Sequence, residues 1–294
     1  MFLIVDGHGM AYRAYHGNAH NLRNAWDDGL FAYLFVDQLR KCVQNVESTL
    51  RRGRSPPDYI RVLVCWDTPG SKAQRLEIFP EYKGERPRPP NLAEWITGLR
   101  GAMRETHERY GLSVSTLEAD DLIAIIVEQA LDGLAPACVI TRDRDLLQLL
   151  RFDDVTIYDP IEKAFCDREI FEHVHGFPVD WWNLYRAIVG DKSDNWKGIK
   201  GMGDVGTTRA IQGAIEDGWT QGKMIDELVR DGHGETLALG LQLVALPFAE
   251  ADYQAALGEL TIALDDDRET DWSELFRNYG IESLDAADVG DWLT

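Results

Sequence analysis

Nine carboxylates lie where the sequence changes from a buried run to a turn or a helix start. The segment LEADDLIAII at 117–126 places three acids directly before a stretch that must be buried. Acidic residues in a first helical turn accept hydrogen bonds from free amides, which explains one or two of these acids but not all of them. The full set is Asp6, Asp67, Glu118, Asp120, Asp121, Asp143, Asp145, Asp191 and Asp194.

If six such carboxylates approach one another, their mutual repulsion is prohibitive without cations. Oxygen ligands alone suit Mg²⁺ or Mn²⁺. A pair of these ions about 4 Å apart promotes in-line displacement at a phosphodiester. Each acid taken singly has a structural explanation, such as a helix cap or a strand end. Taken together, the acids predict a site for two or more divalent ions that catalyses hydrolysis.

The elements that must position these acids alternate between short apolar runs and amphipathic stretches. Strands are expected at 2–6, 61–67, 137–143 and 155–159, and helices at 30–50, 92–110 and 118–131. This alternation indicates an α/β fold with a mostly parallel sheet, in which ligand sites lie beyond the carboxyl ends of the strands. The first three runs end in Asp6, Asp67 and Asp143, so these acids should converge there.

The pattern changes after about residue 175. Short helices are expected at 180–190, 206–215 and 221–230, with glycine-rich turns and no further strand. We therefore place a domain boundary near 170–180, with a smaller helical region behind it.

Cysteine usage and hydropathy predict a cytoplasmic protein. Cys42, Cys65, Cys138 and Cys166 form no CxxC pair, and two of them lie in strand-like runs, which favours buried free thiols in a reducing compartment over zinc or disulfides. No apolar run approaches the roughly 20 residues that span a bilayer. The first residues, MFLIVDGHG, lack a basic leader and a cleavage site and are expected to form a strand.

The net charge of −20 argues against generic binding of nucleic acid, but the charge is unevenly distributed. Residues 51–109 contain 12 Lys/Arg against 8 Asp/Glu, whereas residues 212–294 contain 4 against 19. The acidic C-terminal third is explained by a solvated surface, by a face for a partner, or by repulsion of non-specific DNA. Net charge alone does not decide the function.

Five linked motifs, in order, resemble the flap endonuclease / 5′→3′ exonuclease family, and most of all the 5′-nuclease domain of bacterial DNA polymerase I and its stand-alone phage relatives. The motifs are LIVDGHGMAYRAYHG, FPEYKGERP, LEADDL, ITRDRDLLQL and VGDKSDNWKGIKGMGDVG. The resemblance covers residues 2 to about 215.

The resemblance implies a PIN-like nuclease domain at 1–175, a mostly parallel sheet flanked by helices, with an arch or clamp near 75–95. Residues 176–294 would form a helical DNA-binding region, with a helix-hairpin-helix of the H3TH type at 190–215 and an acidic C-terminal part. Asp6, Asp67, Glu118 and Asp120 match the family's first metal group. Asp121, Asp143, Asp145, Asp191 and Asp194 match the acids nearer the second metal.

The clamp segment QRLEIFPEYKGERPRPP supplies the residues that the resemblance brings to the DNA near the cut, namely Arg75, Tyr82, Lys83, Arg86 and Arg88. Lys83 and Arg86 resemble the pair that stabilises charge on the scissile phosphate. Tyr82 either stacks on a base or packs under the arch. Arg13 resembles a basic residue near the 5′ end, and its alternative is a helix-surface arginine. Only about 10 residues separate Lys83 from the helix near Leu92, so a long threading arch is not expected.

The segment GIKGMGDVGTTRA at 198–210 resembles the element with which the family grips duplex DNA, often together with K⁺. Its glycines allow a phosphate to approach the backbone closely. The residues assigned to DNA here are Lys200, Gly201, Gly203, Gly206 and Thr207. The sequence departs from the common GIGxKTA pattern, because Asp204-Val205-Gly206 stand where a lysine is often found.

The function implied is a Mg²⁺-dependent, structure-specific 5′ nuclease that acts as a monomer on 5′ flaps, overhangs and ends of DNA and on RNA primers annealed to DNA. It would work alone or with a separate DNA polymerase, in a bacterial cell or in a host cytoplasm if phage-encoded. A PIN-type ribonuclease is a second hypothesis, but such enzymes usually lack the 190–215 module. A non-catalytic DNA-structure-binding protein is a third, but it would be expected to have lost ligands, and all nine acids are present.

Overall fold

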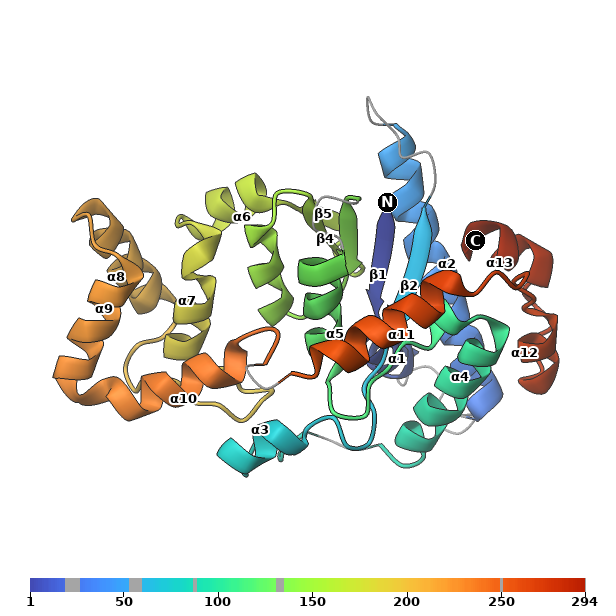
Figure 1. The fold of residues 1–294 in the computed structure, drawn as a ribbon, viewed down its shortest axis with the longest axis horizontal. Helices are drawn as coiled ribbons and strands as arrows, with labels where there is room; N and C mark the ends of the chain where they lie inside the picture. The colour runs from blue at the N-terminus through green and yellow to red at the C-terminus, as the bar shows by residue number, and fades with distance from the viewer. Residues whose placement is uncertain (19–26, 53–59, 87–88, 131–134, 249–250, 294) are drawn as a thin grey trace.

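The computed structural model describes residues 1–18, 27–52, 60–86, 89–130, 135–248 and 251–293 (Figure 1). The strands are β1 (Phe2–Asp6), β2 (Arg61–Cys65), β3 (Ala137–Ile140), β4 (Val155–Asp159) and β5 (Ala164–Cys166). The α-helices are α1 (Gly7–Asn18), α2 (Asp28–Arg51), α3 (Ala73–Ile78), α4 (Leu92–Thr106), α5 (Ala119–Ile125), α6 (Arg168–His175), α7 (Trp182–Val189), α8 (Asp204–Glu216), α9 (Gln221–Leu228), α10 (Gly234–Val244), α11 (Tyr253–Asp265), α12 (Ser273–Asn278) and α13 (Ala286–Leu293). Shorter helical segments are η1 (Glu108–Tyr110), η2 (Ile126–Ala130), η3 (Asp145–Arg151), η4 (Val179–Trp181) and η5 (Val229–His233).

The five strands form one mostly parallel sheet, in the order β2-β1-β3-β4-β5. The pairings up to β4 are parallel, and β5 pairs antiparallel with β4. The four predicted strands and the α/β class are confirmed. The edge strand β5 was not predicted, because three residues are too few to show a periodic pattern. No helix among the described residues is long and apolar enough to cross a membrane.

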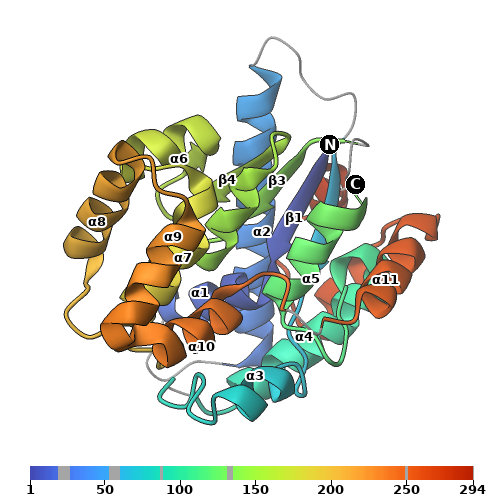
Figure 2. The ribbon, with the colours of Figure 1, turned by 60° about the vertical axis from the view of Figure 1, so that its left-hand side comes forward.

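Helices cover both faces of the sheet, which explains why its strands are continuous apolar runs. Leu3 and Val5 of β1 pack with α1, α2 and α4, whereas Ile4 packs with α5, η3 and α7 on the opposite face. This alternation is the two-residue period of a strand. The two views in Figures 1 and 2 show α2 on one side of the strands and α5 on the other.

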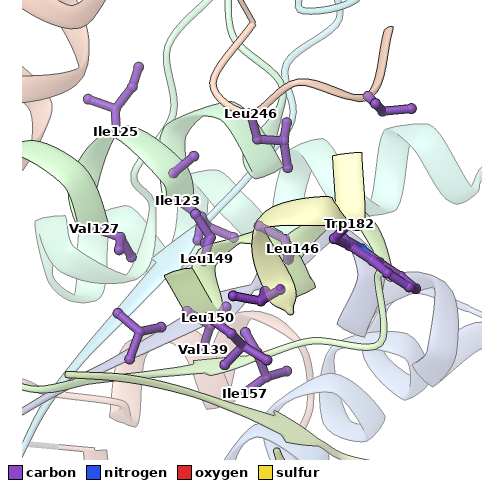
Figure 3. Close-up of a cluster of buried hydrophobic side chains, with 14 of the residues drawn as sticks. Ile123, Ile125, Val127, Val139, Leu146, Leu149, Leu150, Ile157, Trp182 and Leu246 are labelled. Atoms are coloured by element: carbon purple, nitrogen blue, oxygen red, sulfur yellow. The ribbon is translucent and has the colours of Figure 1, made fainter. Parts of the chain in front are cut away.

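The helical region behind the sheet shares its hydrophobic core. Figure 3 shows Trp182 of α7 beside Leu146 of η3, within one cluster that also contains Leu149, Leu246 and Val139 of β3. Because this cluster is continuous, α7 is held rigidly against the carboxyl end of β3. The start of the helical region is therefore fixed relative to the acids of the sheet.

α7 and α8 form a hairpin whose connecting turn folds back onto α7. The amide of Ile199 donates to the carbonyl of Ile188 at 2.7 Å. Gly190 and Gly198 have φ of 84° and 63°, and a Cβ at Gly190 would approach backbone atoms of residues 196–198 to 2.6 Å. Only glycine fits there, because the backbone of the turn packs directly on that of the helix.

The last helices pack against helices of the first half of the chain. α11 packs on α5, α12 on α4 and α13 on α2, and α11 crosses in front of the sheet in Figure 1. Arg104 pairs with Glu259 at 2.8 Å, and Arg40 pairs with Asp288 at 3.3 Å. Some acidic residues of the C-terminal third therefore form ion pairs with basic residues of the first half of the chain. The sequence does not show these pairs, because their partners are far apart along it.

Candidate active site

Acids from three strands and a helix line one cavity of about 330 Å³ at the carboxyl edge of the sheet. Asp6 ends β1, Asp67 and Asp143 follow β2 and β3, and Asp120 lies in the first turn of α5. Lys83 and Arg86 line the same cavity. The parallel topology therefore brings together residues that are far apart in the sequence, as the strand-end argument predicts.

Local hydrogen bonds fix the directions of these carboxylates. Asp6 accepts from the amide of Gly9 at 2.7 Å and from the hydroxyl of Thr141 at 3.2 Å. A Cβ at Gly9 would lie 2.3 Å from Asp6 Oδ2, so only glycine allows this arrangement. Asp67 accepts from the amide of Ala119 at 2.7 Å, which links the end of β2 to the start of α5.

The cavity is electrostatically unfavourable for its own acids. Burial raises the pKa of Asp6, and burial together with the neighbouring Asp121 raises the pKa of Asp120 well above its usual value. Burial and the nearby Asp145 raise the pKa of Asp143 to about 7. Burial also acts to raise the pKa of Asp67, but His8, Lys83 and the amide of Ala119 lower it. The raised values of Asp6, Asp120 and Asp143 have the sign expected for buried carboxylates brought together, whereas Asp67, beside His8 and Lys83, has a pKa below its usual value.

Glu118 and Asp121 face a different set of partners, although their ligand atoms lie within 4.8 Å of each other and of Asp120. Arg75 donates to both oxygens of Asp121, at 2.6 and 2.9 Å, and to Glu118 at 3.0 Å. Glu118 also accepts from the Tyr82 hydroxyl at 2.9 Å and from Lys83 Nζ at 2.7 Å. The acids of LEADDL thus divide, with Asp120 on the cavity and the other two on a buried basic network.

A second acidic group lies beside the cavity, at the start of η3 and in the turn after α7. Arg186 donates to Asp145 at 2.6 Å and also to Asp191. Asp191 receives a further hydrogen bond from the amide of Ser193 at 2.6 Å. Burial acts to raise the pKa of Asp191, but Ser193 and Arg186 lower it below its usual value.

The basic residues of the clamp complete the rim. Arg86 donates to Asp194 at 2.7 Å and to the carbonyl of Ser193 at 2.9 Å, which ties the clamp to the turn after α7. Lys83 adopts a left-handed backbone, φ 52°, and its amide donates to the carbonyl of Asp194 at 3.2 Å. Arg13 lines an adjoining cavity of about 660 Å³ that Asp6, Asp143 and Asp191 also line.

The donor set fits hard divalent cations. The side chains of Asp6, Asp67, Asp120 and Asp143 offer only oxygen ligands. The pKa values of Asp6, Asp120 and Asp143 are raised, and a bound cation would stabilise the ionised forms of these carboxylates. Asp191 lines a cavity together with Asp143, and the amide of Asp145 donates to Asp143 at 2.8 Å, so the second acidic group lies next to the first.

A protein-family model for the 5′-3′ exonuclease, N-terminal resolvase-like domain matches residues 1–175. The chain belongs to this family. Among curated relatives, the 5′-3′ exonuclease of Bacillus subtilis is 29% identical over 218 residues, covering 69% of this chain and 66% of its own length. Thermostable DNA polymerase I of Thermus aquaticus is 28% identical over 223 residues, covering 73% of this chain. The chain spans only 24% of that polymerase's length.

Solved structures of the bacteriophage T5 enzyme share the fold. T5 5′-exonuclease with bound zinc superposes with a TM-score of 0.64 at 22% identity, over 89% of this chain and 99% of the T5 chain. A T5 D15 flap endonuclease complex with DNA and metal ions gives a TM-score of 0.61 at 21% identity, over 99% and 98%. At this level of identity the likeness establishes the architecture, including the helical region after the sheet.

Within this family fold, two residues predicted to contact DNA are buried. Arg75 is 2% exposed and bonded to Glu118 and Asp121, and Tyr82 is 3% exposed with its hydroxyl on Glu118. Both side chains therefore lie in the buried network around Glu118 rather than on open surface. Arg88 lies outside the described residues.

The hairpin residues divide in a similar way. Lys200, Gly201, Gly203 and Gly206 are exposed, and a Cβ at any of the three glycines would meet no other atom within 4 Å. Thr207 is fully buried, and its hydroxyl donates to the carbonyl of Met202 at 3.3 Å. The glycines therefore face open surface, whereas the side chain of Thr207 closes the turn.

Sequence reasoning missed Arg186 and His8. Arg186 interrupts the apolar segment WNLYRAIV, and a buried charge requires a partner, so this interruption was a usable signal. His8 Nε2 lies 3.5 Å from Asp67 and the side chain lines the cavity, but a histidine following a strand end carries no comparable signal.

Proposed function

We propose that this chain is a divalent-metal-dependent 5′ nuclease that cleaves phosphodiester bonds near 5′ ends of DNA, as a 5′→3′ exonuclease and a flap endonuclease. The observation that supports this most directly is the single cavity lined by Asp6, Asp67, Asp120 and Asp143, with Lys83 on its rim. Membership of the family and the names of its relatives support the substrate class.

Mg²⁺ or Mn²⁺ ions, when bound by the nine acids predicted as ligands, would supply an activated water and stabilise the leaving 3′ oxygen. Besides the four on the cavity these are Glu118, Asp121, Asp145, Asp191 and Asp194, and the ligand atoms of Glu118, Asp120 and Asp121 lie within 4.8 Å of one another. Lys83 supplies fixed positive charge, because Glu118 raises the pKa of its ammonium well above the usual value against the effect of burial. Its place on the cavity lets it stabilise charge on the scissile phosphate. Arg86, half-exposed beside Asp194, orients the same phosphate from the rim.

The hairpin would hold the duplex beside the cut. The exposed backbone at Gly201, Gly203 and Gly206 leaves space for phosphate oxygens, and Lys200 adds charge next to it. A K⁺ ion between these carbonyls and a phosphate is part of the proposal. Arg13, half-buried on the adjoining cavity, would contact the strand near its 5′ end.

The wider biological setting extends the proposal. RNA primers annealed to DNA are further substrates, the chain acts as a monomer, and a DNA polymerase supplies the flaps. The family's occurrence within DNA polymerase I supports the link to a polymerase.

A 5′-labelled flap duplex with Mg²⁺ tests the function. We expect short 5′ products, their loss with EDTA, and no comparable cleavage of a single-stranded RNA of the same sequence. Intact flap under these conditions contradicts the proposal, and preferred cleavage of the RNA would favour the PIN-type ribonuclease. Flap binding without turnover, at saturating Mg²⁺ or Mn²⁺, would favour a non-catalytic structure-binding protein.

A further inference from the structure

Arg186 is the only residue of α7 with a charged side chain, and it is buried. It is 2% exposed and lies in a helix whose remaining buried residues are apolar or aromatic. Moving a guanidinium out of water is costly unless charged partners compensate it. Its two partners, Asp145 and Asp191, are both acids of the second group.

The two carboxylates reach Arg186 from different elements. Asp145 begins η3 after β3, whereas Asp191 lies in the turn that follows α7. Nε bonds to Asp145 Oδ1 at 2.6 Å and Nη2 bonds to Asp191 Oδ2. A planar guanidinium fixes the direction of both bonds at once, which a lysine ammonium cannot do. One side chain thereby sets the separation of two carboxylates that would otherwise repel each other.

α7 also supports the exposed glycine turn. The turn packs on the end of α7 through Ile199 and Gly190, and the Tyr185 hydroxyl donates to Asp204 at the start of α8 at 2.6 Å. The helix that presents Arg186 to the acids is therefore the helix on which the hairpin rests.

We propose that Arg186 is a positioning residue that aligns Asp145 and Asp191 as one cation-binding unit beside the first acidic group. This inference rests on the proposed function and identifies how the helical region contributes to its chemistry. Arg186 does not line the cavity of the first group. It acts through the two carboxylates.

Kinetics of three variants test the proposal. In Arg186→Met we expect kcat to fall by about 10²-fold or more, as for other misplacements of about 1 Å. KM, and the Kd for a flap duplex in Ca²⁺ without cleavage, should stay within a few-fold of wild type. Arg186→Lys should recover part of kcat, since it keeps the charge but reaches one carboxylate. Guanidinium chloride should partly restore kcat in Arg186→Ala.

The matched control is Arg230→Met, which removes an exposed ion pair with Glu227 and should leave kcat unchanged.

Mn²⁺ titration followed by electron paramagnetic resonance supplies a readout that needs no turnover. Wild type and Arg186→Lys should bind the same number of ions, and Arg186→Met should lose the weaker one. If wild type fails to cleave flaps, the proposed function is wrong, yet this titration still decides the role of Arg186.

Several outcomes would overturn the proposal. Unchanged kcat in folded Arg186→Met would show that the arginine only holds α7 in place. A parallel loss of kcat and duplex affinity would assign it to the grip on DNA. If Arg186→Met does not fold, a wild-type kcat in Arg186→Lys would count against it equally, because a lysine reaches only one of the two carboxylates.

Discussion

Arg75 and Asp121 meet through two hydrogen bonds, 2.6 and 2.9 Å long, and neither side chain is more than 3% exposed. The same guanidinium donates to Glu118, and the amide of Phe248 donates to Asp121 at 2.8 Å. This buried network joins α3, the start of α5 and the segment before α11. It holds the base of the clamp against the helix that presents Asp120 to the cavity.

Because two carboxylates depend on Arg75, Arg75→Met should destabilise the protein strongly. Removing one partner of a buried ion pair typically costs about 3–5 kcal/mol. Urea unfolding measures the loss, with Arg230→Met as the control, since an exposed pair contributes about 0–1 kcal/mol. Equal losses in the two variants would show that the network contributes no more than a surface pair.

Asp143→Asn should abolish cleavage and yet stabilise the protein in EDTA. The raised pKa of about 7 means that the fold favours the protonated form, so ionised Asp143 costs stability at pH 8. The amide removes that cost, with an expected gain of at least about 1 kcal/mol. The gain should be complete above pH 7 and should shrink as the pH falls toward 4. Thermal unfolding at pH 8 and pH 5 checks this, and turnover equal to wild type would refute a role in metal binding.

The sequence was sufficient to predict the fold class, the four longer strands and the acids at their ends. Apolar runs of the right length are local signals, and parallel topology brings their ends together wherever they occur in the chain. The sequence was not sufficient to predict that Asp120 lines the cavity whereas Asp121 pairs with Arg75, because Arg75 is remote in sequence. The packing of α11–α13 against the first half of the chain was also hidden, since pairs such as Arg40–Asp288 are long-range.

Lys83→Ala should reduce turnover more than substrate binding. Lys83 is 8% exposed, lines the cavity and is bonded to Glu118, so it can act on the phosphate at the cut but offers little surface to the rest of the DNA. Loss of one group that stabilises transition-state charge costs about 10²–10³-fold in kcat. Single-turnover kinetics with the flap duplex, beside Lys41→Ala on the exposed face of α2, measures the effect. A defect confined to KM would instead place Lys83 on the DNA-gripping surface.

His107 should make stability depend on pH between about 6.5 and 4. Burial, with Arg109 close by, lowers its pKa from 6.5 to about 4, so the unfolded chain binds the proton more tightly. The unfolding free energy should therefore fall as the pH decreases through this window, by about 2 kcal/mol. The neutral ring accounts for its contacts with Asp266 at 3.1 Å and Arg109 at 3.2 Å.

Other groups titrate in the same range, so the measurement is the difference between wild type and His107→Asn. Urea unfolding at half-unit pH intervals should give a difference that changes steadily from pH 6.5 to pH 4 and is flat above pH 7. A difference independent of pH would mean that His107 keeps its ordinary pKa in the folded protein.

Gly206→Ala should separate folding from DNA binding. Gly206 lies in the first turns of α8, and a Cβ there meets open space, so the protein accepts alanine without strain. Alanine in place of a helical glycine stabilises by about 0.5–1 kcal/mol. A phosphate that approaches the backbone at this point would meet the added methyl group. We therefore expect a higher melting temperature together with weaker binding of duplex DNA.

Gly213→Ala is the matched control, because Gly213 lies in the same helix, also with open space at its Cβ, but away from the turn. It should raise the melting temperature without changing the Kd for a flap duplex in Ca²⁺. Lys200→Ala, in contrast, should weaken binding. It should also reduce the slope of log K against log salt concentration by about 1, the value for one phosphate contact. If Gly206→Ala and Gly213→Ala bind DNA equally well, the glycine turn is not where the backbone meets a phosphate, and the duplex must contact another face of the helical region.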